Sequence, residues 1–456
     1  MKTHQLILLS TVLFITIFYG EDLGLNLGIL GISYALLAWF NSAEKRQTPL
    51  FILLFVTTVL SSIAFAWFGD FASLLAIFTS AFLLAFQTKN HGLHNILVIP
   101  VFAFNFITFP YRFIQFEKWL PKSNTTEGFK KVLAVVLIPA LLILAFVGVY
   151  ALGSEHFSSV FLDFKFKFNF WQFFVLGALG FFLAFNFWNF HIPQFFHSLN
   201  HHLKNEFSSE PKNTRPAFPF LDLNTEVRSG IISFTALNVL LLIFIITFNY
   251  EQFVEISKTP SQLSAETHNR VYAVIVSVVM AVLVIMFYFK KGLNVDRNSK
   301  YLITLTKTWI FLNAVLILSA AAKNAEYVLN LGFTYKRLAV FAFLTLSIIG
   351  LITTFLKIQN KKANAYIFNH MVWYFYGTIL VSSFFNWGAF LTSQNLSKRN
   401  FDLPYHLKSV NFNQKQLLEF AKKTGDEKLT QELQKKIADE KRKTFLSKII
   451  YYQKFN

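Results

Sequence analysis

Apolar residues form long runs along this chain, and short polar loops separate the runs. About 20 apolar residues in a helix cross the hydrocarbon core of a bilayer. A helix also satisfies its own backbone hydrogen bonds inside lipid. The pattern therefore predicts an all-α, polytopic transmembrane helix bundle. The eleven predicted spans are about 5–20, 24–40, 49–68, 71–87, 132–152, 170–190, 229–249, 269–289, 301–322, 338–356 and 364–386.

The stretch 95–116 does not fit the pattern cleanly. It is apolar, but Pro100 and Pro110 interrupt it, and Arg112, Glu117 and Lys118 lie at or just beyond its end. If it crossed the membrane, the bundle would have twelve spans. We expect a re-entrant or interfacial segment instead, because only then does the charge of the loops alternate consistently.

Lysine and arginine concentrate in the loops that would share one side of the membrane. These loops are 41–48, 111–131, 290–300 and 357–362. Basic loops stay in the cytoplasm, so the N-terminus is predicted to be cytoplasmic and the tail after the last span extracytoplasmic. The predicted organisation has an N-terminal transmembrane half (1–225, with interfacial segments near 95–116 and 191–205), a C-terminal half (226–388) and a helical extramembrane tail (389–456).

Composition narrows the chemistry. The chain has no cysteine, which excludes disulfides, thiolate-bound metals and cysteine nucleophiles. The net charge of +18 lies in loops and in the tail rather than on one face, so it indicates membrane orientation and no nucleic-acid partner. There is no phosphate-binding Walker loop, dinucleotide fingerprint or nucleophile elbow, and no row of buried carboxylates. We therefore expect membrane lipids as partners and no cofactor.

The tail has an apolar stripe at helical spacing. A first helix is predicted to end near Gly425, and a second follows it. The stripe consists of Leu417, Leu418, Ala421, Leu429, Leu433 and Ile437, continued roughly by Phe445 and Ile449. Two interpretations are open: the stripe packs on the bundle or the membrane surface, or segment 413–452 docks a protein partner.

Polar residues of the second half converge on the predicted outer face. Glu266 and His268 lie where one span opens, a segment from Lys323 to Arg337 joins two spans, and Trp387 ends the last span. These residues could form an ordinary interfacial belt. They could also bind an anionic head group or small anion through Lys336 and Arg337, with His268 and Glu266 relaying a proton. The candidate site residues are Glu266, His268, Asn324, Tyr335, Lys336, Arg337 and Trp387.

Histidines gather on the predicted inner side. His197 and His201 are four residues apart, beside His191 and His202, and this spacing can chelate zinc. They are a weak candidate metal pair, because two histidines are half of a usual ligand set and no glutamate completes a zinc-protease motif. The alternative is an interfacial amphipathic helix with histidines at its wet edge.

Several stretches of the second half resemble a known family. They are Glu226–Gly230, the start at Thr267-His268 of a span that ends at Phe289–Gly292, Trp309 with Asn313–Leu316, Lys323 to Arg337, Asn386-Trp387, and Asp402–Tyr405 with Leu407. Over about 226–410 the chain resembles bacterial multi-pass membrane proteins of unknown function (domain of unknown function four-one-seven-three, related to four-one-five-three). The resemblance implies a protein of the bacterial cytoplasmic (inner) membrane and implies no activity.

Three functions remain open at this stage. The first is a non-enzymatic transport, sensing or envelope protein with an outer-face anion site. The second is a membrane-embedded transferase for a lipid-linked substrate, with Glu266 or His268 as base. The third is an assembly scaffold that acts through its tail.

Overall fold

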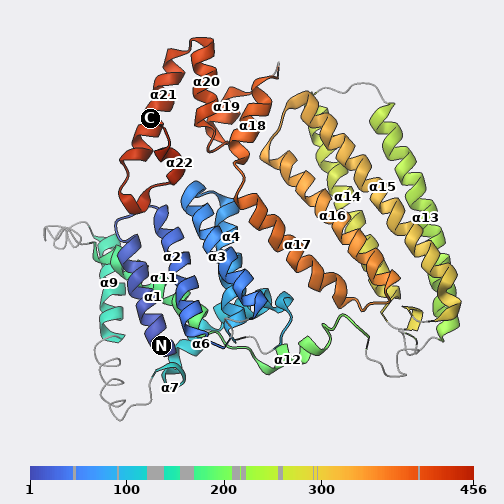
Figure 1. Cartoon of the computed structure of the whole chain (residues 1–456), viewed down its shortest axis with the longest axis horizontal. Coiled ribbons are helices and arrows are strands. Elements are labelled where there is room, and N and C mark those ends of the chain that lie inside the picture. The colour runs from blue at the N-terminus through green and yellow to red at the C-terminus, as the bar shows by residue number, and fades with distance from the viewer. Residues whose placement is uncertain are drawn as a thin grey trace.

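The computed structural model describes residues 1–44, 48–89, 92–120, 138–154, 169–207, 216, 222–254, 260–290, 292–294, 296–398 and 401–455. Every regular element in these residues is helical, as predicted. Eleven helices run side by side in the bundle (Figure 1). They are α1 (Thr3–Phe18), α2 (Leu25–Asn41), α3 (Pro49–Phe68), α4 (Phe71–Lys89), α9 (Ile138–Gly153), α11 (Phe170–Trp188), α13 (Leu223–Phe253), α14 (Pro260–Tyr288), α15 (Lys300–Leu331), α16 (Tyr335–Gln359) and α17 (Ala365–Ser383).

The length and composition of these helices make the chain a membrane protein. Among the described residues, seven helices are long and apolar enough to cross a bilayer, namely α3, α4, α11, α13, α14, α15 and α16. Helices α1 and α2 are apolar but shorter. The membrane character is thus confirmed, while the count of eleven spans stays a prediction.

Residues 95–119 form a series of short helices, η1 (Asn95–Leu97), α5 (Val98–Ile107), α6 (Phe109–Ile114) and α7 (Phe116–Trp119). Pro100 lies in the first turn of α5, where its missing backbone N–H costs no hydrogen bond. Pro110 lies in the first turn of α6, so that α5 ends before it and a new helix begins there. None of these helices is long enough to cross a bilayer alone. Helix α12 (Gln194–His201) lies across the same end of the bundle as the N-terminus (Figure 1).

Two hydrophobic cores divide the bundle. The first is built mainly from α1 to α5 and α11, and the second from α13 to α16. Helix α17 packs against both α4 and α16. Its Tyr376 belongs to the first core, and the Tyr376 hydroxyl lies 3.0 Å from Ser80 Oγ and 2.6 Å from Thr57 Oγ1. Helix α17 therefore joins the two cores, although its sequence position is in the C-terminal half.

The tail lies at the end of the bundle opposite the N-terminus, over the helices of the first core (Figure 1). It comprises α18 (Trp387–Leu396), α19 (Leu403–Lys408), α20 (Gln414–Thr424), α21 (Glu427–Arg442), η6 (Phe445–Ser447) and α22 (Ile450–Gln453). Helix α20 ends at Gly425, whose φ of +68° is favourable for glycine, so the predicted helical tail and its break are confirmed.

The apolar stripe of the tail is buried within the chain. Leu417, Ala421, Leu429 and Leu433 pack together, while Ile437 and Ile449 pack in a cluster with Phe68 of α3. Helix α21 ends at Arg442, so Phe445 leaves the stripe and is exposed. A protein partner for 413–452 stays a prediction, and such a partner would have to contact other faces of the tail.

The tail is bonded to the turn between α1 and α2. The Leu25 N–H donates to the Lys448 carbonyl at 2.9 Å, and the Asp22 N–H donates to Ser447 Oγ at 2.8 Å. A Cβ atom on Gly24 would lie 2.5 Å from the Ser447 backbone, so only glycine permits this contact.

Candidate functional site

The predicted outer-face residues lie at the tail end of the second core. Helix α15 continues to Leu331, beyond the predicted end of this span at residue 322, so Lys323 and Asn324 lie on the helix. Hydropathy marks the apolar part of a helix, which explains why the predicted span is shorter than the helix. Gly332 follows with φ +80°, and a Cβ there would lie 2.7 Å from Asn395 Oδ1.

Arg337 is a capping residue in this structure. Its guanidinium donates to the carbonyls of Leu331 (3.1 Å) and Gly332, and it lies 3.9 Å from the centroid of the Tyr327 ring. Asn324 Nδ2 donates to the Arg337 carbonyl at 3.0 Å. The last carbonyls of α15 lack helical partners, and a cation at a helix C-terminus is favourable. Several of the donors predicted to bind an anion are thus used by the turn itself.

The other predicted residues of this end have mixed surroundings. Lys336 is exposed, the Tyr335 N–H donates to Tyr405 Oη at 3.2 Å, and Trp387 Nε1 donates to the Ser382 carbonyl at 3.0 Å. Glu266 and His268 lie on α14, which packs against α15 and α16, but their side chains are outside the described residues. The structure thus brings Asn324, Tyr335, Lys336 and Arg337 to one turn; anion binding there stays a prediction.

The predicted metal pair acquires no third ligand. His197 and His201 lie on α12 as expected. Across the part of the chain that the structure describes, no group of three or more His, Cys, Asp or Glu side chains could hold a metal ion. The two histidines thus remain half of a ligand set.

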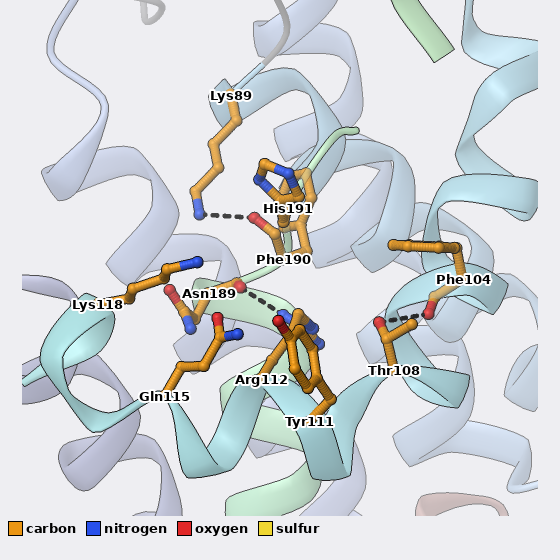
Figure 2. A pocket seen from close by; sticks show the side chains of 10 residues that line it. All are labelled: Lys89, Phe104, Thr108, Tyr111, Arg112, Gln115, Lys118, Asn189, Phe190 and His191. Carbon is orange, nitrogen blue, oxygen red and sulfur yellow. Dashed lines mark hydrogen bonds between the residues drawn. The ribbon is translucent and has the colours of Figure 1, made fainter. Parts of the chain in front are cut away.

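A different cavity, of about 460 Å³, opens at the end of the bundle that carries the N-terminus (Figure 2). Three cations line it: Lys89 at the end of α4, Arg112 on α6 and Lys118 on α7. The remaining lining residues are polar or aromatic, and none of them is a carboxylate. They are Phe104, Thr108, Tyr111, Gln115, Asn189, Phe190 and His191.

The segment 189–191, which follows α11, is held by side chains of other helices. Arg112 donates to the Asn189 carbonyl at 2.6 Å, and Lys89 Nζ donates to the Phe190 carbonyl at 3.1 Å (Figure 2). Asn105, which is fully buried, accepts from the His191 N–H at 2.7 Å and donates to the His191 carbonyl at 2.8 Å. The carbonyls of 189–191 follow the end of α11 and have no partner within a helix, and these side-chain donors satisfy them. The cavity wall is therefore built by contacts that are far apart in sequence.

Arg112 is held firmly in this arrangement. Its guanidinium also donates to the Asn105 carbonyl at 2.9 Å and to Asn186 Oδ1 at 2.5 Å. Its carbon Cζ lies 5.1 Å from the centroid of the Phe185 ring. Arginine stays protonated in proteins, so this is a fixed positive charge beside the cavity.

The electrostatics of the cavity favour an anion. Lys89 makes one hydrogen bond among the described residues, to a carbonyl, and Lys118 is exposed at the rim. Partial burial and the positive charges of Arg112, Lys118 and Lys89 lower the pKa of His191, so the free imidazole is neutral near pH 7. A negatively charged group that enters the cavity would be attracted by three cations, and it would meet no carboxylate among the lining residues that the structure describes.

The sequence alone does not bring Arg112, Lys118 and His191 together. It places Arg112 and Lys118 at the basic end of a segment interrupted by proline, and His191 among several histidines of the predicted inner side. A signal was present, since an arginine directly after a proline-broken apolar segment is costly near lipid unless partners surround it.

Comparison with known protein families now adds to the geometry. The model of the family described as a domain of unknown function (DUF4153) matches residues 48–417. The chain belongs to this family. The matching model is that of the family named above as the related one, and it extends the resemblance from 226–410 into the first half. Neither a curated protein nor a solved structure matches the chain. All the lining residues of the cavity fall inside the DUF4153 match.

Proposed function

We propose that this protein of the DUF4153 family binds a phosphate-type oxyanion in the cavity of Lys89, Arg112 and Lys118, as a non-enzymatic transport or sensing protein of the bacterial cytoplasmic membrane. One observation carries the proposal: three cations from three helices line a single cavity, and none of the described residues on its lining is a carboxylate. The basic loops of the chain support a cytoplasmic position for this end, with the N-terminus inside and the tail outside.

The chemistry of the lining favours an oxyanion over a neutral ligand. The two lysines provide mobile point charges that can bind phosphate. The Arg112 guanidinium donates to Asn189, Asn105 and Asn186, so it contributes a fixed positive charge to the cavity. Thr108, Gln115 and Asn189 add neutral polar groups on the same lining. A cavity of about 460 Å³ has room for a phosphate group together with part of the molecule that carries it.

The phosphate could be free or part of a lipid. The helices that form the cavity wall also expose apolar side chains, namely Ile99 and Ile107 on α5 and Ile114 on α6, which are 79%, 79% and 67% exposed. Such side chains suit contact with acyl chains. The shared chemistry is the phosphate oxyanion, and its source is decided by experiment.

The test uses the full chain and a charge reversal at the rim. Lys118→Glu changes an exposed residue on the cavity lining, and Lys204→Glu is the matched control, because Lys204 is exposed and not on the lining. Binding of inorganic sulfate and phosphate is measured by calorimetry in detergent. Binding of phosphatidylglycerol is measured by native mass spectrometry after exchange into nanodiscs.

We expect Lys118→Glu to weaken binding about 5- to 30-fold, since reversing a charge a few ångströms away removes about 1–2 kcal/mol even when water screens it. Lys204→Glu should bind as the unaltered protein does. Loss of sulfate binding identifies a free oxyanion, whereas loss of phosphatidylglycerol alone identifies a lipid head group. If neither ligand binds, or if both variants bind equally, the proposal is wrong.

A further inference from the structure

His191 lies at the rim of the cavity in a fixed position. Asn105 holds both backbone groups of His191, and the neighbouring Phe190 carbonyl is held by Lys89. Figure 2 shows the His191 imidazole on the lining together with the three cations. Three described cations act on the His191 imidazole, each from a different helix of the cavity wall: Lys89 from α4, Arg112 from α6 and Lys118 from α7.

We infer that the cavity takes up a proton on His191 when it binds its anion, so that occupancy is coupled to pH. This inference rests on the proposed function and adds its regulation. An imidazole beside three cations resists a fourth positive charge. A bound oxyanion cancels part of that charge, and the imidazolium can then donate a hydrogen bond to it.

The coupling must act in both directions. If the anion favours the protonated imidazole, then protonation must strengthen anion binding by the same factor. The free His191 has a lowered pKa, from burial first and then from Arg112, Lys118 and Lys89. The pKa of His191 therefore starts below the ordinary histidine value of about 6.5 and rises when the anion binds, so that a proton is taken up with the anion.

Other titratable groups of this end are placed less well for this role. His94 is not on the cavity lining, and its backbone N–H donates to Asn200 Oδ1 at 2.9 Å. Glu117 precedes Lys118 but does not line the cavity. Among the described residues of the lining, His191 is the histidine.

The test needs ligands whose own charge does not change with pH. Sulfate meets this condition as a free oxyanion, and the phosphodiester of phosphatidylglycerol meets it as a lipid. The affinity of the full chain for each is measured between about pH 5.5 and 8. Calorimetry of sulfate binding in two buffers of different ionisation enthalpy then counts the protons taken up.

We expect the affinity to rise as the pH falls, by up to about tenfold per pH unit, with up to one proton taken up. The His191→Asn variant keeps the backbone contacts with Asn105 and should show a nearly flat profile without proton uptake. The matched control is His202→Asn, because His202 is an exposed histidine at the same end that does not line the cavity, and it should keep the slope.

The outcomes of this test distinguish a failure of the proton coupling from a failure of the proposed function. If neither ligand binds at any pH, the proposed function is wrong. If a ligand binds with the same affinity at every pH and without proton uptake, the anion site stands and the coupling is wrong. A slope that persists in His191→Asn would place the proton on another group and would also overturn the inference.

Discussion

Asn105 on α5 joins the series of short helices over 95–119 to the segment that follows α11. Its replacement tests how the cavity is built. The side chain is fully buried and donates to the Val101 carbonyl at 2.7 Å and the His191 carbonyl at 2.8 Å, while its oxygen accepts the His191 N–H at 2.7 Å. Asn105→Leu keeps the approximate size and removes these bonds. Two backbone groups of His191 then lose their partner.

The expected loss can be worked from these contacts. A backbone group that loses its partner costs about 1–3 kcal/mol when buried, and the lower value applies here because His191 lies at the rim. Two groups thus cost about 2 kcal/mol of local stability, which corresponds to about 30-fold faster amide exchange at His191. Hydrogen exchange followed by mass spectrometry, on peptides that cover 189–193, measures it.

A variant in the second core provides the control. Asn238 Nδ2 donates to the Leu305 carbonyl at 3.0 Å, so Asn238→Leu removes one polar contact between α13 and α15. Exchange in 189–193 should stay unchanged in this variant. If Asn105→Leu folds and inserts but exchanges at His191 at the original rate, the account of the cavity wall is refuted.

Three further predictions concern the tail and the second core. Gly24→Ala should release the tail and speed its removal by protease, because the new Cβ would lie 2.5 Å from backbone atoms, whereas Gly153→Ala meets nothing within 4 Å and should behave normally. Burial lowers the pKa of His406, so the folded tail holds it neutral and the unfolded chain binds the proton more readily. Stability should then fall as the pH drops below about 6.5, and thermal unfolding of His406→Gln should depend less on pH. Lys357 is fully buried, with Nζ 2.6 Å from the Phe289 carbonyl. Thermal unfolding should show that Lys357→Ala lowers the free energy of unfolding by about 3 kcal/mol and that Lys357→Met lowers it less, because methionine keeps the packing of the aliphatic stem. Equal losses in the two variants would contradict this.

Some of these features could be read from the sequence because they depend on local pattern. Apolar runs indicated the long helices, and Gly425 indicated the break in the tail. The hydropathy pattern gave the wrong helix end where a helix continues beyond a charged residue. Lys357 was assigned to a cytoplasmic loop, but α16 continues to Gln359, and the carbonyl of Phe289 offsets part of the cost of burying the ammonium group.

The cavity could not be predicted for a different reason. Asn105 and His191 are 86 positions apart, and Arg112 and Asn189 are 77 apart. The periodicity of residues along one helix does not show that one of its side chains will bond to the backbone of another segment. Asn105 bonds to the backbone of the segment after α11, and the sequence could not show that this partner carries the imidazole at the rim.

The extent of the family match separates two kinds of tail contact. The match ends at residue 417, inside α20, so it includes α18 and α19 and leaves out α21 and α22. Asn395 on α18 bonds both backbone groups of Phe333 in the turn after α15, at 2.7 and 2.8 Å. The contacts of Gly24 with Ser447, by contrast, lie outside the match on both sides. The family match therefore covers the cavity and the joint between α15 and α18, whereas the contact that fastens the end of the tail to the turn between α1 and α2 lies outside it.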